Sequence, residues 1–246
     1  MDRVQKTSGT RVELQMARSM CWHCQSEVAG EYFCDRCVKV QPLSKELDYF
    51  TCLGLSRRLT IDPDNLEKRF YELSRTFHPD FFQTKTESEQ AISLGNSALL
   101  NTAYRTLKDP IQRVEYLLRL EAGSVKDIRN SPPADLFEEI LALQDNLDEF
   151  REASSTESSP EVMAPLRNKL TADRDTLERR QREMERRLFE LFEEWDTLQD
   201  QSDAPNADSR KKREILLKDM REILSNRTYV RNIVDDLVAT IGERAN

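Results

Sequence analysis

Apolar side chains recur every three or four residues along most of this 246-residue chain. In residues 62–77 the apolar positions are Leu66, Phe70, Leu73 and Phe77. This spacing places side chains on one face of an α-helix, where they can pack against a neighbouring element. Asp62 stands at the expected N-cap, and the proline after it favours the first helical position. The pattern predicts an amphipathic helix over this stretch.

Similar patterns fill much of the remaining chain. Residues 45–120 contain four of them, and three longer ones follow a connector at residues 123–133. Hydrophobic residues make up 38% of the chain and charged residues 33%, which suits slender helical bundles better than one thick core. We therefore expect an all-α fold, with one helical bundle at residues 45–122 and a three-helix bundle at residues 134–246.

Two pairs of cysteines precede the helical region. Nine residues separate the pairs, and the odd total of five cysteines does not suggest a set of disulfides. Two CxxC turns can together supply four thiolates in the tetrahedral arrangement that Zn(II) prefers. Residues 20–42 are predicted to form a small knuckle around a structural zinc ion, with the ligands Cys21, Cys24, Cys34 and Cys37. The remaining Cys52 is expected to be a buried apolar residue.

Charge and composition argue against several classes of function. The net charge of −8 disfavours a general nucleic-acid binder, and no apolar run is long enough to enter a membrane. Residues 1–19 are basic and hydroxyl-rich without an apolar centre, so they are predicted to be a disordered or targeting segment rather than a secretory signal. The chain carries neither a GxxxxGK phosphate loop nor a GxGxxG loop, and it has two histidines for acid–base chemistry. No enzymatic activity is expected.

One of these histidines lies in the short sequence His78-Pro79-Asp80. The proline is expected to end the preceding helix, because the residue before a proline is pushed out of the helical region. A capping-box pattern, Thr86 followed by Glu89, predicts the start of the next helix. The three residues are thus expected to form the loop between two antiparallel helices.

This arrangement resembles a J-domain, the module with which co-chaperones stimulate the ATPase of DnaK-type chaperones. The segments DYFTCLGL, HPDFF and NTAYRTLKDPIQRVEYLLRL, and the acidic helix after them, are similar to the iron–sulfur cluster co-chaperones of the HscB/Jac type. The CWHC and FCDRC segments resemble the N-terminal zinc module of some eukaryotic members. The resemblance covers roughly residues 21–240.

The resemblance implies which residues contact the chaperone. In this family the HPD residues, here His78, Pro79 and Asp80, engage the ATPase domain of the chaperone. The preceding helix presents a basic face, which here corresponds to Lys68, Arg69 and Arg75. Glu67 and Glu72 lie on the same helix and dilute its positive charge.

The resemblance also implies that the C-terminal bundle binds an IscU-type iron–sulfur scaffold protein. The matching positions are Leu136, Phe137, Leu141, Ile223 and Leu224. Helical periodicity independently separates Phe137 and Leu141 from the apolar stripe of their helix, whereas Leu136 fits that stripe. Glu138 and Ala142 depart from the residues that many relatives carry at those positions.

These inferences predict a co-chaperone that delivers the scaffold to a DnaK-type chaperone for cluster transfer. The family association favours the mitochondrial matrix, with the cytoplasm as the alternative, and the sequence leaves open whether the chain forms a homodimer. Two other functions remain open at this point. One is a general J-protein that binds unfolded clients, and the other is a thiol oxidoreductase that uses the CxxC pairs. A zinc-ribbon nucleic-acid binder is disfavoured by the acidic balance.

Overall fold

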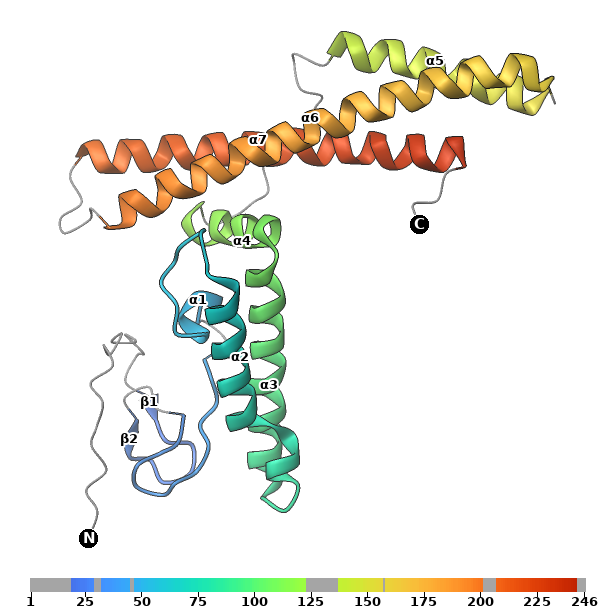
Figure 1. The fold of residues 1–246 in the computed structure, drawn as a ribbon. Coiled ribbons are helices and arrows are strands. Elements are labelled where there is room, and N and C mark those ends of the chain that lie inside the picture. The colour runs from blue at the N-terminus through green and yellow to red at the C-terminus, as the bar shows by residue number, and fades with distance from the viewer. Residues whose placement is uncertain are drawn as a thin grey trace. The chain divides into compact units, whose positions relative to one another are not determined.

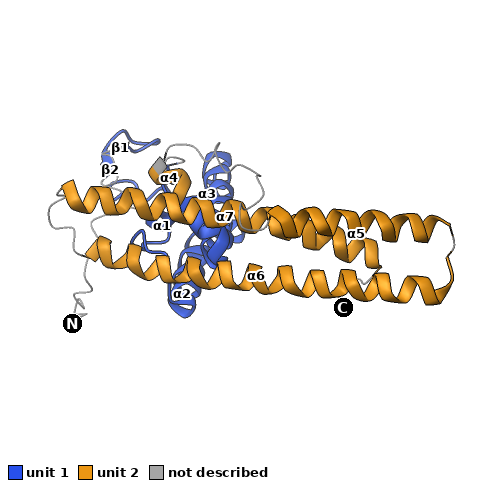
Figure 2. Ribbon diagram, turned by 90° about the horizontal axis from the view of Figure 1, so that it is seen from above, with its two compact units in different colours: residues 1–117 blue, residues 118–246 orange. Residues whose placement is uncertain are grey.

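The computed structural model describes residues 19–28, 32–44, 47–122, 137–156, 158–200 and 207–242, and these are mostly helical (Figure 1). They confirm the expected all-α fold, with a group of four cysteines near the N-terminus. The chain divides into two compact units, residues 1–117 and residues 118–246 (Figure 2). The predicted connector at residues 123–133, and nearly all of the predicted segment 1–19, lie outside the described residues.

The first unit contains the helices that the sequence predicts for its J-like region. They are α1 (Tyr49–Cys52), α2 (Pro63–Phe77), the short 3₁₀ helix η1 (Pro79–Phe82), α3 (Glu87–Lys108) and the start of α4 (Pro110–Ala122). Helices α2 and α3 lie side by side and antiparallel (Figure 1). The fully buried side chains of this unit include Leu53, Leu59, Leu66, Phe77, Leu100, Ala103 and Leu107.

The ends of α2 and α3 have the caps that the sequence predicts. The Asp62 side chain accepts a hydrogen bond from the Asp64 amide at 3.1 Å, which satisfies an N–H group that the helix leaves open. At the start of α3, Thr86 and Glu89 form a reciprocal capping box. Further along the pair, the rings of Phe70 and Tyr104 stack with their centroids 4.2 Å apart.

The cysteine knuckle belongs to the first unit. Strands β1 (Ser19–Met20) and β2 (Glu27–Val28) pair antiparallel, and an isolated bridge joins Phe33 to Val40. The buried cluster of the knuckle consists of Cys21, Val28 and Cys34. So small a cluster buries little apolar surface, and the knuckle therefore needs stabilisation from other contacts or from a metal.

The second unit is a three-helix bundle of α5 (Phe137–Ser155), α6 (Pro160–Asp200) and α7 (Ala207–Ile241). Helices α6 and α7 run antiparallel over most of their length, and α5 packs against both (Figure 1). One core cluster contains Ile140, Leu143, Leu147, Phe150, Leu170, Leu177, Val230, Val234, Leu237 and Ile241. Its α5 members are the apolar stripe that the sequence predicts. Among the described residues, no helix combines the length and the apolar character needed to span a membrane.

Candidate functional site

The HPD loop exposes the side chains of His78 and Asp80 at the junction of α2 and η1. His78 is both the last cap of α2 and the first cap of η1, where its Nδ1 atom accepts a hydrogen bond from the Asp80 amide at 3.3 Å. The side chains of His78 and Asp80 are 53% and 69% exposed, and Nδ1 lies 3.5 Å from Asp80 Oδ2. Groups so open to water suit recognition of a partner better than buried acid–base chemistry.

Both ends of this loop are fixed to α3. Phe77, directly before the loop, is fully buried, and its carbonyl oxygen accepts hydrogen bonds from the hydroxyls of Ser93 at 2.7 Å and Ser97 at 2.9 Å. On the far side Phe82 is buried, and the Thr86 capping box follows within four residues. The loop therefore presents exposed side chains from an anchored backbone, which lowers the entropy lost on binding.

An apolar groove adjoins the loop between α2 and α3. It has a volume of about 750 Å³ and is lined by Phe70, Tyr71, Ser74, Arg75, His78, Pro79, Asp80, Phe81, Leu94, Ser97, Ala98 and Asn101. Three large side chains in it are mostly exposed, namely Tyr71 at 53%, Phe81 at 66% and Leu94 at 63%. Exposed apolar clusters of this kind mark docking surfaces.

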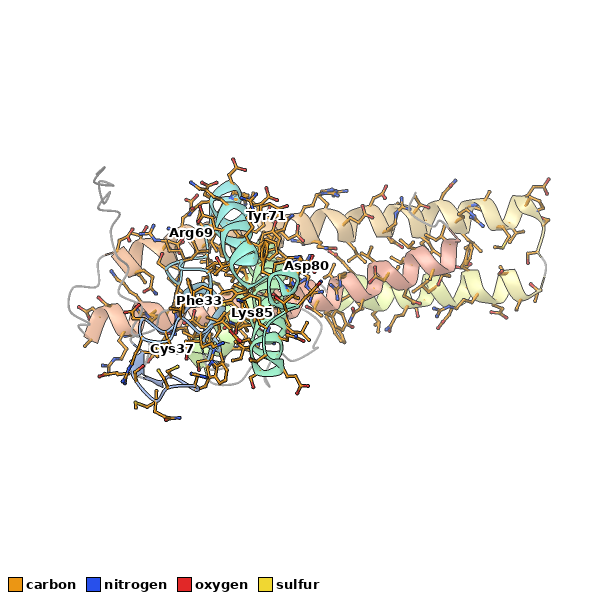
Figure 3. All side chains as sticks on the ribbon, turned by 90° about the horizontal axis from the view of Figure 1, so that it is seen from below. Phe33, Cys37, Arg69, Tyr71, Asp80 and Lys85 are labelled. Atoms are coloured by element: carbon orange, nitrogen blue, oxygen red, sulfur yellow. The ribbon has the colours of Figure 1, made fainter. Side chains whose placement is uncertain are left out.

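The three basic residues of α2 lie on two different sides of the helix. Arg75 lines the groove, and Lys68 is seven residues earlier, about two helical turns away on the same face. Arg69 stands about 100° away from Lys68, and Figure 3 shows it on the opposite side of α2 from Tyr71. All three side chains are exposed. The groove thus gathers the HPD residues with Arg75, and Arg69 lies apart from them.

The four cysteines of the knuckle lie close enough together to hold one metal ion. Their sulfur atoms all lie within 4.8 Å of one another, and the pairs Cys21–Cys37 and Cys24–Cys34 are each 3.6 Å apart. Zinc–sulfur bonds of about 2.3 Å in a tetrahedron place the sulfurs about 3.8 Å apart. The residues therefore fit a metal ion of this kind.

The two CxxC turns repeat the same backbone pattern. The amides of Cys21 and Cys34 donate to the carbonyls of Ser26 and Lys39, five residues later in each case. Gln25 and Val38, each directly after the second cysteine of a pair, have positive φ angles of 60° and 58°. Residues other than glycine rarely adopt this backbone conformation, and here it lets each turn direct two sulfurs to one point.

Polar contacts lower the pKa of two of the four thiols, Cys24 and Cys34, whereas burial raises the pKa of Cys37 to about 12. The Ser26 hydroxyl lies 3.0 Å from Cys24 Sγ and 3.2 Å from Cys34 Sγ, and it lowers the pKa of both thiols. Gln41 Nε2 donates to Cys21 Sγ at 3.4 Å. Thiolates are the form that binds metal, so these contacts prepare the site for it. Burial raises the pKa of Cys52 to about 12, and that thiol is the buried residue that the sequence predicts.

The predicted scaffold contacts are differently exposed in the second unit. Phe137 and Leu141 are 55% and 53% exposed on α5, and Leu136 lies outside the described residues. Ile223 on α7 is half-buried. Leu224 is only 1% exposed, so its proposed role in direct contact with a partner is corrected: its side chain belongs to the protein interior.

A second groove lies between α5 and α7, beside these residues. Its volume is about 470 Å³, and its lining comprises Ile140, Leu143, Gln144, Leu147, Asp148, Arg151, Tyr229, Asn232, Ile233 and Asp236. Phe137 is seven residues before Gln144 and so shares the face of α5 that borders the groove. Sequence reasoning missed Tyr229 and Ile233, although their spacing of four residues, on either side of the apolar Val230, was a usable signal.

Comparisons with known proteins agree with this architecture. No family model matches the chain. It is 31% identical over 154 residues to the mouse iron–sulfur cluster co-chaperone protein HscB, covering 61% of this chain and 64% of that protein. It is 34% identical over 113 residues to the co-chaperone protein HscB of Proteus mirabilis, covering 46% and 65%.

The chain thus spans less than two thirds of the length of these curated relatives. A solved structure of the human co-chaperone protein HscB shares the fold, with a TM-score of 0.51 and 24% identity over 89% of this chain and 97% of that one. The resemblance that the HPD and cysteine motifs predict is confirmed, because the chain is similar in sequence to HscB-type co-chaperones.

Proposed function

We propose that this protein is a co-chaperone of iron–sulfur cluster assembly. Through the HPD loop it stimulates the ATPase of a DnaK-type chaperone, and through its C-terminal bundle it delivers an IscU-type scaffold protein for cluster transfer. Residues 45–122 act as the J-domain and residues 134–246 as the scaffold-binding bundle. The observation that carries the proposal is an exposed HPD loop on an anchored backbone, in a chain related to HscB proteins.

The groove beside the HPD loop supports a contact with the chaperone. His78, Pro79, Asp80 and Arg75 all line it, and exposed apolar rings lie among them. Apolar side chains give such an interface its affinity, whereas Arg75 and Lys68 speed the encounter with an acidic surface and set its orientation. Arg69, on the other side of α2, adds to the positive charge that this helix presents to the chaperone.

The scaffold-binding surface is proposed on the exposed face of α5. Phe137 and Leu141 form the α5 patch, and the groove between α5 and α7 offers an apolar floor next to it. Arg151 joins Asp148 at 3.6 Å and Asp236 at 3.0 Å, so it fixes charged groups at the rim of this groove. An apolar centre with a charged rim is the usual anatomy of a protein interface.

The cysteine knuckle is proposed to hold one zinc ion as a structural site. Cys21, Cys24, Cys34 and Cys37 would supply all four ligands, which leaves no open position for a substrate. Bound zinc would offset two of the four thiolate charges, and the knuckle would fold around the metal. Thiols committed in this way would not act as an oxidoreductase, and we propose that the chain catalyses no reaction of its own. The mitochondrial matrix is its proposed location.

Steady-state ATPase assays with a DnaK-type chaperone test this function. The chain should accelerate ATP hydrolysis in a saturable manner, and His78→Gln should abolish the acceleration while helicity and scaffold binding stay unchanged. Thr84→Ala, at an exposed position of the same loop outside the HPD residues, serves as the matched control. Acceleration that survives His78→Gln would refute the J-domain assignment, and a preference for denatured clients over the scaffold would favour a general J-protein.

A further inference from the structure

We propose that the cysteine knuckle positions the HPD loop, so that metal binding in the knuckle controls how well the loop engages the chaperone. The positioning residues are Tyr32, Lys39 and Gln41, which contact α2 and α3 on both sides of the loop. The inference rests on the proposed function only for its effect on the chaperone. Figure 1 shows the knuckle beside the end of the α2–α3 pair where the loop lies.

The first contact supports the residue that directly precedes the loop. The ring of Tyr32 meets the ring of Phe77 edge-on, with centroids 5.3 Å apart and planes at 89°. Burial raises the pKa of Tyr32, as expected for a phenol packed against the helices. Because Phe77 is fully buried and adjoins His78, this ring contact limits how the end of α2 can move.

The second contact supports the residues that follow the loop. Lys39 Nζ donates to Glu89 Oε2 at 2.9 Å, and the same oxygen accepts from the Thr86 hydroxyl at 2.8 Å and the Thr86 amide at 3.2 Å. Glu89 is only 4% exposed, so the ion pair is better shielded from water than a surface pair. Lys39 therefore braces the capping box in which the loop ends.

The third contact connects the metal site itself to α3. Gln41 Nε2 donates to Cys21 Sγ at 3.4 Å, and its backbone carbonyl accepts from Asn96 Nδ2 at 2.9 Å. Asn96 also accepts from the Leu43 amide at 2.9 Å, and it is 3% exposed. One buried asparagine thus holds the segment that leaves the knuckle, and the Cys21 sulfur orients the glutamine on that segment.

These contacts depend on the fold of the knuckle, and that fold depends on the sulfurs. Two of the three residues in its buried cluster are cysteines, and two of its turns use positive φ angles at Gln25 and Val38. Besides the hydrogen bonds of the two turns, a metal bound to all four sulfurs, which lie within 4.8 Å of one another, would be the main link between the turns. Loss of metal should therefore release the brace, while the Ser93 and Ser97 hydrogen bonds keep part of the loop anchored.

Amide hydrogen exchange of the full chain tests the coupling without any chaperone. Removal of metal by a chelator should raise exchange in residues 78–86 as well as in residues 20–42, and exchange in α6 and α7 should stay unchanged. Re-addition of Zn(II) should restore protection in both segments. If exchange rises in the knuckle alone, the two segments are uncoupled and the inference is wrong, whatever the chaperone assay shows.

Two charge-matched variants test the positioning role with metal still bound. Lys39→Gln removes the contact with Glu89, whereas Arg36→Gln removes the same charge from an exposed position of the knuckle. Lys39→Gln should raise amide exchange in residues 83–89. It should also raise, about fivefold, the concentration of the chain that gives half-maximal stimulation of the chaperone, and Arg36→Gln should change neither quantity. Both variants should retain one metal ion per chain.

The chaperone assay also separates failure of this inference from failure of the proposed function. If the wild-type chain stimulates the chaperone equally with and without metal, and Lys39→Gln matches Arg36→Gln, the brace is refuted and the co-chaperone function stands. If the wild-type chain does not stimulate at all, the proposed function fails, and hydrogen exchange still decides whether the knuckle and the loop are coupled.

Discussion

Replacement of Phe137 and Leu141 by alanine tests the proposed scaffold-binding face quantitatively. Phe137 is 55% exposed, which leaves roughly 110 Å² of its surface for a partner to cover. At about 25 cal/mol per Å², full coverage contributes about 2.8 kcal/mol. Leu141 is 53% exposed, and covering that half adds about 1 kcal/mol.

Part of this burial energy offsets the cost of association, whereas well-packed hot-spot contacts strengthen binding beyond the burial energy. The double variant should therefore lose about 2–4 kcal/mol of binding free energy. The dissociation constant should rise roughly 30-fold to 1,000-fold. Isothermal titration calorimetry with an IscU-type scaffold measures it. Val162→Ala on α6, where the side chain is 49% exposed, is the surface control and should leave binding unchanged.

A core variant distinguishes binding from stability. Leu143 is 4% exposed, and Leu143→Ala should lower the free energy of unfolding by about 2–5 kcal/mol. Phe137→Ala with Leu141→Ala should leave the unfolding midpoint in urea nearly unchanged. Unchanged scaffold affinity in the double variant would refute the assignment of the α5 patch, and a large loss of stability there would place these residues in the core.

Three further predictions concern the first unit. Cys21→Ser should abolish metal binding and loosen residues 20–42, with helicity by circular dichroism retained beyond residue 45. Because burial raises the pKa of Cys52 to about 12, a maleimide should leave this thiol unmodified in the native chain at pH 8, and modification before unfolding would contradict its burial. The hydrogen bond from Lys39 lowers the pKa of Glu89 below its usual 4.5. The stability from this pair is therefore fully present above pH 4.5 and is lost as the pH falls through the lowered value, so the difference in urea midpoint between wild type and Glu89→Gln should shrink between pH 6 and pH 3.

Local patterns sufficed to predict the helices, because each depends on residues close in sequence. The Asp62 cap, the Thr86 capping box and the α5 stripe all follow from spacings of four residues or fewer. The cysteine site was predictable for a similar reason, since two short turns bring four sulfurs together. Sequence alone therefore located the HPD loop and the group of four cysteines.

The contacts that position the loop were not predictable in this way. In the sequence, Asn96 is an ordinary polar residue of a helix. In the structure it is buried, and its side-chain oxygen accepts a hydrogen bond from the Leu43 amide, 53 residues earlier in the chain. The burial of Leu224 likewise depends on which helix face meets a neighbour, and its own periodicity does not decide this. Such features depend on packing between distant segments, where each polar group must find a partner.

The central claim is that one chain joins chaperone and scaffold, and a complementation assay measures this directly. With the wild-type chain, the scaffold concentration that gives half-maximal chaperone ATPase should fall well below its value without the chain. His78→Gln and the Phe137→Ala, Leu141→Ala variant should each lose this effect, and an equimolar mixture of the two should also lose it, because neither chain carries both sites. Full recovery in the mixture, or an unchanged half-maximal concentration with the wild-type chain, would contradict the account.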